Sequence, residues 1–294
     1  MALFQKLYFP ISAKKSDITE NNVKNTKYSD GNNKTIYFSS NFFKNKMVIL
    51  DMSKNDWFVD WFDTSYYHVL YQNRDEQEAE RFIRNVLTHL NLSVNSRLLD
   101  LACGKGRHAK FLSEFDHQVM GVDLSPNSIE RANEYAHEKL RFQTHDMREV
   151  IEGEQFDVIF NLFTSFGYFD DESENKRMCG SISKMLVPGG RLLIDFMNAK
   201  KVIENLVSSE EKVLEGLHFD IKRNYDGKHI YKYIQVNDNG HVSQYMERVQ
   251  ALLLTDFLAL LETNFEIIGT FGSYDLNVFH EDTSDRLILL AQLK

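Results

Sequence analysis

Residues 98–112 read Leu-Leu-Asp-Leu-Ala-Cys-Gly-Lys-Gly-Arg-His-Ala-Lys-Phe-Leu, and this stretch decides the fold. A short apolar run ends in an acid, Asp100, and two glycines follow it, Gly104 and Gly106. Apolar residues at helical spacing come next, beginning with Ala109. A strand, a tight turn and a helix in this order bring unpaired backbone N–H groups to one point, and glycine there leaves room for a ligand. The stretch therefore predicts a ligand site at the carboxyl end of a parallel strand.

The next apolar run supplies a second acid. Val119–Val122 leads to Asp123, which lies 17 residues after Gly106. A carboxylate at the tip of the neighbouring strand is placed to accept hydrogen bonds from both hydroxyls of a ribose. The two runs together therefore predict a site for a nucleoside.

Asp100 bears on which nucleoside the site would bind. Gly104, Gly106 and Ala109 satisfy the dinucleotide pattern G-x-G-x-x-G/A, which fits a nicotinamide cofactor. A buried acid just before the glycines would repel a pyrophosphate, but it would attract the ammonium group of an amino acid. S-adenosylmethionine combines an adenosine with an amino acid and a sulfonium, and it has no phosphate. Asp100 therefore favours S-adenosylmethionine over a dinucleotide.

The stretch resembles the first motif of the class I S-adenosylmethionine-dependent methyltransferases of the small-molecule type, which has an acid, a glycine-rich turn and a following helix. Ala102 stands where that family often has its first glycine. The resemblance extends over residues 57–294. In the family an acid after the third strand bonds the adenine amino group, and Asp146 matches it. Residues 161–168 match the fourth motif, which lies beside the methionine part of the cofactor.

The resemblance implies a set of cofactor-binding residues. They are Tyr71, Arg74, Asp100, Ala102, Gly104, Gly106, Asp123, Leu124, Asp146, Met147, Asn161 and Phe163. The aromatic segment from Trp57 to Arg74 resembles the N-terminal segment that closes over the cofactor in small-molecule members. Plainer alternatives stay open: the aromatic residues could be core, Tyr71 and Arg74 could serve surface contacts, and Asp146 could only form a turn.

Strands and helices alternate through the rest of the chain, which predicts an α/β fold with a doubly wound, seven-stranded, mostly parallel (Rossmann-like) sheet. The pattern predicts a helix over 76–90, a helix from Pro126 to about Glu138, and a helix capped by Thr255. It predicts later strands at 140–144, 156–162, 191–196, 265–271 and 286–293.

Residues 208–250 interrupt this alternation and predict an inserted antiparallel lid of three strands. Asp226-Gly227 and Asn239-Gly240 are the hairpin turns between runs of alternating apolar and polar residues. In relatives such as sugar-amine and glycine N-methyltransferases, a sheet inserted here roofs the acceptor pocket. A contact between copies of the chain is the alternative reading, and a homodimer is one possibility.

The first 51 residues differ from the remainder. Residues 1–50 hold eight lysines against three acids, are rich in asparagine and serine, and show no sustained apolar period. We expect residues 1–51 to be a disordered leader and 52–294 to be the methyltransferase domain.

Composition excludes several classes of protein. A net charge of −9 disfavours binding to nucleic acid, and no apolar run is long enough to span a membrane. Two cysteines, one of them inside the glycine turn, favour a reducing compartment, and we expect the cytoplasm. The histidines show no metal-ligand spacing, so no metal is expected.

The sequence favours a methyltransferase that transfers a methyl group to nitrogen or oxygen of a small molecule. The adenine-methylating D/N-P-P-Y/F tetrapeptide is absent, because Asn-Leu-Phe-Thr stands at 161–164. Sequence does not choose a general base among Tyr168, His241, Tyr245, Tyr274 and His280. A catalytically silent cofactor-binding or partner-binding protein, and less favoured an NAD-dependent oxidoreductase, are the alternatives.

Overall fold

The structure is a computed structural model that describes residues 25–29, 35–39, 61–72, 76–169 and 171–294. The chain divides into two compact units, and Phe9–Asp51 forms the smaller one. In that unit β1 (Asn25–Ser29) pairs with β2 (Thr35–Ser39) in an antiparallel ladder. The leader over residues 1–51 stays a prediction. Residues 57–60, 73 and 74 of the predicted closing segment, Trp57 and Arg74 among them, lie outside the described residues.

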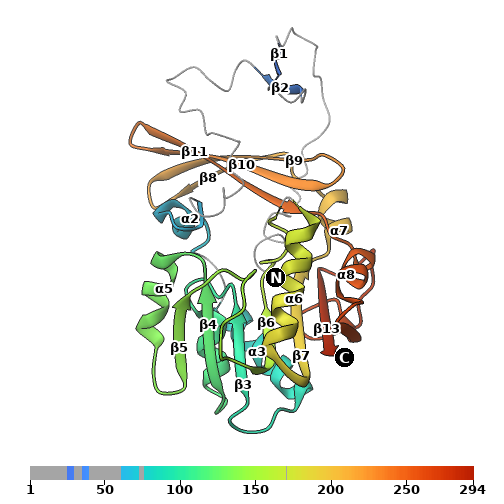
Figure 1. Ribbon diagram of the computed structural model, residues 1–294. Coiled ribbons are helices and arrows are strands. Elements are labelled where there is room, and N and C mark those ends of the chain that lie inside the picture. Colours follow the sequence, from blue (N-terminus) through green and yellow to red (C-terminus); the bar gives the residue numbers. More distant parts are fainter. Residues whose placement is uncertain (1–24, 30–34, 40–60, 73–75, 170) are drawn as a thin grey trace. The chain divides into compact units, whose positions relative to one another are not determined.

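The larger unit is built on a seven-stranded sheet in the order β12-β13-β7-β6-β3-β4-β5 (Figure 1). Neighbours from β7 to β5 run parallel, whereas β12 and β13 are antiparallel at one edge. The strands are β3 (Arg97–Leu101), β4 (Gln118–Asp123), β5 (Leu140–Thr144), β6 (Phe156–Asn161), β7 (Leu186–Met197), β12 (Phe265–Phe271) and β13 (Arg286–Leu293). The strand order reverses between β3 and β6, which is where open α/β sheets bind ligands. The predicted fold class is confirmed.

Successive side chains of the central strands point to opposite faces of the sheet, so alternate residues pack into two separate hydrophobic cores. Leu98 packs with α3 (Glu76–Leu90) and α4 (Arg107–Ser113), while Leu99 packs on the other face with α6 (Glu172–Met185) and α8 (Leu254–Leu261). α5 (Pro126–Ala132) contacts β4 and β5, and α7 (Ala199–Glu204) follows β7. The sheet is therefore covered on both faces, and the carboxyl ends of its strands are left for a site.

The inserted sheet has four antiparallel strands rather than the predicted three. They are β8 (Ser209–Leu214), β9 (Leu217–Tyr225), β10 (His229–Asp238) and β11 (His241–Gln250). The strand that sequence reasoning missed, β8, reads Ser-Glu-Glu-Lys-Val-Leu and looks too charged for a strand. It forms because Glu215 and Gly216 both adopt positive φ, 49° and 80°, and turn the chain tightly back onto β9.

One face of this inserted sheet, here called the lid, packs on a segment that precedes the central sheet. Trp61 and Leu70, from the segment 61–72 that contains α2 (Ser65–Leu70), form a core with apolar side chains of β9 and β10. The lid residues in that core are Phe219, Ile221, Ile234 and Val236. Segment 61–72 is therefore part of the fold, as well as lying under the lid.

Two helices differ from their predictions. α5 ends at Ala132, and a single 3-10 turn (Asn133–Tyr135) replaces the rest of the helix expected to reach about Glu138. The predicted cap at Thr255 is wrong, because α8 begins at Leu254 and Asp256 accepts the backbone N–H of Leu253 at 2.7 Å. A local hydrogen bond thus sets the start of α8, and α5 is shorter than predicted because the chain tightens into the 3-10 turn.

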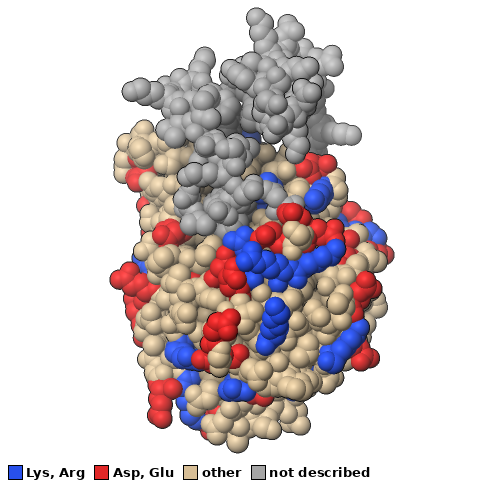
Figure 2. All heavy atoms as spheres, in the orientation of Figure 1, with Lys and Arg blue, Asp and Glu red and all other residues tan. Residues whose placement is uncertain are grey.

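The described surface carries both signs of charge. Figure 2 shows acidic and basic side chains interspersed over the face in view. Among the helices of the described residues, none is long and apolar enough to cross a membrane.

Candidate functional site

The glycine turn between β3 and α4 bends through three left-handed residues. Ala102, Gly104 and Gly106 have φ of 65°, 56° and 78°. Ala102 costs about 1–2 kcal/mol in this conformation, where a glycine would cost nothing. An added Cβ at Gly104 would meet no atom within 4 Å, whereas one at Gly106 would lie 2.6 Å from the ring of Phe142. Gly104 therefore borders open space, and Gly106 is required for packing against Phe142.

Asp100 is the buried acid of this turn. Its side chain is 1% exposed, and Oδ2 has no hydrogen-bond partner among the described residues. Burial raises the pKa of Asp100 to about 7, against a backbone hydrogen bond from Ala109 that lowers it. A buried carboxylate oxygen without a donor is costly, and a ligand that brings a cationic N–H donor would remove that cost.

Asp123 links the end of β4 to the glycine turn. Its Oδ2 accepts the backbone N–H of Gly104 at 2.8 Å, and its Oδ1 accepts that of Ser125 at 2.9 Å. Burial raises the pKa of Asp123, although these backbone donors oppose the shift. Each carboxylate oxygen can accept more than one hydrogen bond. Asp123 can therefore still accept hydrogen bonds from both hydroxyls of a ribose.

Segment 61–72 is pinned beside Asp123. The Asp63 carboxylate accepts hydrogen bonds from Ser125 Oγ and Asn127 Nδ2, both at 2.5 Å. The start of α5 is thereby joined to the segment that sequence resemblance assigned to cofactor closure.

Asn161 and Phe163 follow at the end of β6. Asn161 is fully buried, and its Nδ2 donates to the carbonyl of Leu101 at 3.1 Å across the point where the strand order reverses. Phe163 lies with its ring centroid 5.3 Å from the guanidinium carbon of Arg107, the first residue of α4. The structure thus brings the fourth motif against the glycine turn.

Asp146 follows β5 and is held by Arg148. The guanidinium donates to both carboxylate oxygens, at 3.0 Å to Oδ1 and 2.5 Å to Oδ2. Burial raises the pKa of Asp146, but the hydrogen bonds from Arg148 outweigh it and the net shift is downward. The neighbouring predicted residues, Leu124 and Met147, pack at the edge of the core on the α6 face.

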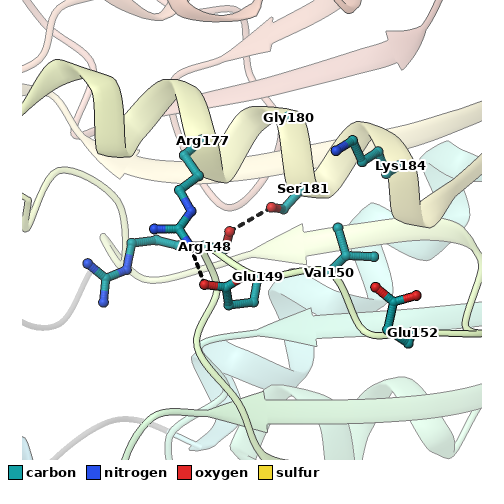
Figure 3. Close-up of a pocket in the computed structure, with 8 residues that line it drawn as sticks. All are labelled: Arg148, Glu149, Val150, Glu152, Arg177, Gly180, Ser181 and Lys184. Carbon is teal, nitrogen blue, oxygen red and sulfur yellow. Dashed lines mark hydrogen bonds and ion pairs between the residues drawn. The ribbon is translucent and has the colours of Figure 1, made fainter.

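A surface pocket of about 350 Å³ lies beside Arg148, between α6 and the loop after β5 (Figure 3). It is lined by Arg148, Glu149, Val150, Glu152, Arg177, Gly180, Ser181 and Lys184. Arg177 pairs with Glu149, and Ser181 Oγ donates to the carbonyl of Arg148 at 2.6 Å. No residue of the glycine turn lines this pocket, so it is separate from the candidate cofactor site.

Tyr71 is engaged by the lid. Its hydroxyl donates to Glu247 Oε1 at 2.5 Å and accepts a hydrogen bond from the Lys232 ammonium. Trp61 Nε1 donates to the same carboxylate oxygen at 2.7 Å, and Lys232 Nζ lies 3.6 Å from Glu247 Oε2. Burial lowers the pKa of Lys232 to about 8, although the nearby Glu247 opposes the shift.

Sequence reasoning missed Lys232 and Glu247, although a signal existed. The Asn239-Gly240 turn places Lys232 directly opposite Glu247 in the β10–β11 ladder. Lys232 and Ile234 are two residues apart on β10, so their side chains lie on the same face of the lid. The opposite charges of Lys232 and Glu247 on that face therefore indicate a polar cluster under the lid.

The five candidate bases differ in location and in exposure to solvent. Tyr168 lies 5.4 Å from the ring of Phe62, and Tyr245 lies 4.6 Å from the ring of Trp61, so both join the aromatic cluster under the lid. His241 and His280 are exposed. Tyr274 is buried, and its hydroxyl donates to Asp195 at 3.2 Å.

Known proteins are similar to this chain in sequence. A family model for a methyltransferase domain matches residues 98–190. A glycine/sarcosine N-methyltransferase of Aphanothece halophytica is 25% identical over 265 residues, covering 86% of this chain and 92% of that protein. Glycine N-methyltransferase of Mus musculus is 31% identical over 119 residues, or 35% of this chain and 40% of the mouse protein.

Solved structures agree in fold. The sugar N-methyltransferase of Streptoalloteichus superimposes with a TM-score of 0.60 at 23% identity, covering 78% of this chain and 92% of that one.

Several of the sequence relatives match over less than half of their own length. The match spans 40% of the mouse enzyme and 42% of an amino-sugar N,N-dimethyltransferase of Streptomyces venezuelae.

The doubly wound sheet, the acid–glycine turn and the second acid define the class I S-adenosylmethionine-dependent methyltransferase fold. Residues 98–190 match the methyltransferase domain model, and the sheet that carries them has the fold of these methyltransferases, which supports S-adenosylmethionine as the cofactor. The Asp100 Oδ2, which has no hydrogen-bond partner among the described residues, fits the ammonium group of S-adenosylmethionine, and an added Cβ at Gly104 would meet no atom within 4 Å.

Proposed function

We propose that the protein transfers the methyl group of S-adenosylmethionine to nitrogen or oxygen of a small molecule. The observation that carries this proposal is the buried Asp100 carboxylate, whose Oδ2 lacks a hydrogen-bond partner among the described residues. Nitrogen is favoured over oxygen because two of the relatives are a glycine/sarcosine N-methyltransferase and an amino-sugar N,N-dimethyltransferase.

The residues of the glycine turn and its neighbours would hold the cofactor. Asp100 would accept a hydrogen bond from the ammonium group, directly or through water, and Asp123 would accept the ribose hydroxyls. Asp146, fixed by Arg148, would meet the adenine amino group, while Asn161 and Phe163 would bound the methionine part. The bound cofactor supplies an electrophilic methyl carbon.

Leu124 and Met147 would add apolar contact, and Ala102 and Gly106 would shape the turn. Tyr71 and Arg74 complete the predicted set, with Tyr71 acting from its position between Lys232 and Glu247.

The lid and segment 61–72 would align the acceptor and exclude water, which is most of what an in-line displacement needs from a protein. Of the five candidate bases, Tyr168 and Tyr245 have the best support, because both lie in the aromatic cluster under the lid. An acceptor amine must be neutral to attack the methyl carbon, so an ammonium acceptor first loses a proton to water. A tyrosine hydroxyl near the acceptor can then hold the neutral amine by accepting its N–H, and solvent takes the proton that the methylated nitrogen releases.

Other properties belong to the same proposal. The interspersed charges of Figure 2 and the net charge of −9 support a small-molecule acceptor over nucleic acid. Two free, buried cysteines support a cytoplasmic location, and homodimerisation is testable by sedimentation.

Calorimetry with S-adenosylmethionine, S-adenosylhomocysteine and NAD, side by side, tests the cofactor assignment. We expect binding of the first two and none of NAD. Methyl transfer is then measured on glycine, sarcosine, amino sugars and hydroxy compounds, with DNA, RNA and protein as comparisons. Binding of S-adenosylmethionine without turnover on any acceptor would favour a catalytically silent protein, and preferential labelling of a macromolecule would reject the small-molecule proposal.

A further inference from the structure

The loop after β6 contains two successive non-glycine residues in the left-handed conformation. Phe163 has φ of 62° and Thr164 has φ of 61°. L-residues avoid this region because Cβ approaches the following carbonyl oxygen, and a β-branched threonine avoids it more strongly. Such strained backbone persists only where the surrounding structure holds it, and it clusters at functional sites. Contacts from other elements must therefore hold this loop.

Asp195, on β7, holds both strained residues. Its Oδ2 accepts the backbone N–H of Phe163 at 2.9 Å. Its backbone carbonyl accepts the N–H of Thr164, also at 2.9 Å. Asp195 is 1% exposed, so these hydrogen bonds form away from competing water.

Two residues from the C-terminal part of the chain hold Asp195 in turn. Arg286 Nε donates to Asp195 Oδ1 at 2.8 Å, and Arg286 Nη2 donates to Thr164 Oγ1 at 3.1 Å. The Tyr274 hydroxyl donates to Asp195 Oδ2 at 3.2 Å. The guanidinium compensates the buried carboxylate, so the network is satisfied on both sides. Asp195, Tyr274 and Arg286 all lie outside the residues that the family model matches.

The strained conformation aims Phe163 at the glycine turn. Its ring lies against Arg107 and 6.5 Å from the ring of His108, and these two residues begin α4 directly after Gly106. A loop that relaxed to negative φ at residues 163–164 would redirect this side chain. The network thus fixes one wall beside the candidate cofactor site.

We propose that Asp195 and Arg286 are positioning residues for methyl transfer, which hold residues 163–164 in the left-handed conformation against the glycine turn. The proposal rests on the proposed function, since the wall has a role only if the cofactor lies there. Tyr274 supports Asp195 in this arrangement instead of serving as a base.

A suppressor experiment tests the proposal on the full chain. Asp195→Asn removes the ion pair, and we expect S-adenosylhomocysteine to bind about tenfold or more weakly by calorimetry. Thr164→Gly added to Asp195→Asn should restore most of that affinity, because glycine adopts positive φ without strain. Where an acceptor is known, kcat should fall more than the acceptor KM rises, and the same second substitution should recover it.

The control is Asp282→Asn, which removes an exposed carboxylate paired with Lys200 at 2.6 Å and should leave affinity unchanged. Wild-type affinity in folded Asp195→Asn overturns the proposal, and so does weakened binding that Thr164→Gly fails to restore. Should Asp195→Asn not fold, Arg286→Lys provides the same comparison, because it keeps the charge and loses the paired geometry. Binding needs no acceptor, so failure of the proposed function, seen as no turnover by the wild type, is distinguishable.

Discussion

The Asp100 side chain should make both stability and cofactor binding depend on pH. Its pKa of about 7 in the folded protein lies above the ordinary value of 3.8. The stabilisation from the protonated carboxyl is therefore full below about pH 4 and is lost as pH rises through 7. Asp100→Asn should raise the free energy of unfolding of the ligand-free protein at pH 8 by a few kcal/mol, on the order of 1.4 per unit of pKa shift.

Urea unfolding at pH 5 and pH 8 measures this difference, with the exposed Asp116→Asn as the matched control. Affinity of the wild type for S-adenosylmethionine should rise between pH 6 and 8 as Asp100 ionises, and that of Asp100→Asn should be weaker and flat. Equal pH profiles for the two proteins would rule out the assigned role.

The two glycines of the turn should fail in different ways. Gly104→Val places a branched side chain in the open space at Gly104 and should abolish cofactor binding, and because Gly104 has φ of 56° it should also cost about 1–2 kcal/mol of stability from backbone strain. Gly106→Ala forces a methyl group against Phe142, which should cost about 1–3 kcal/mol of stability. Phe142→Ala should relieve part of this clash, so adding Gly106→Ala should cost less stability in a Phe142→Ala background than in the wild type. Thermal unfolding and calorimetry on the same preparations separate the two effects, and loss of binding alone in Gly106→Ala would contradict the packing role.

Among the elements, the lid and segment 61–72 share one half-buried carboxylate, that of Glu247. Glu247→Gln leaves the ammonium of Lys232 without its counter-charge, and it weakens the bonds from Trp61 and Tyr71. We expect destabilisation of about 1–3 kcal/mol, and a non-additive double-mutant cycle with Tyr71→Phe. Glu266→Gln on the exposed side of β12 serves as the comparison. Additive effects in the cycle would mean that Tyr71 and Glu247 act separately.

At the scale of the whole molecule, a chain that begins at Met52 should keep its unfolding midpoint and its cofactor affinity. Phe9–Asp51 forms the smaller of two compact units, and its sequence shows no apolar period that would bury a core face. A loss of several degrees in midpoint on truncation would show that the N-terminal residues stabilise the domain.

The sequence predicted those parts of the molecule that depend on local pattern. The strands 140–144, 265–271 and 286–293 and the helix 76–90 were found with their bounds, because apolar period and turn residues act within one element. β8 was missed because pairing through a tight turn overrode its charged composition.

Sequence reasoning found the acids of the candidate site but not the residues that support them. Phe142 fills the space beside Gly106, and Asp195 and Arg286 meet across 91 residues of sequence. Nothing in their spacing indicates these contacts, since they follow from how the strands are ordered in the sheet.

The lid enters and leaves the chain between α7 and α8, and every predicted cofactor-binding residue precedes it. Genetic exchange of the segment 208–250 between relatives would therefore replace the lid and leave the glycine turn unchanged. Under the proposed function, such an exchange gives evolution a short route to a new acceptor. It offers the same route to protein engineers, who could graft a lid from a relative together with segment 61–72, whose Trp61 and Tyr71 bond the lid, and leave the glycine turn unchanged.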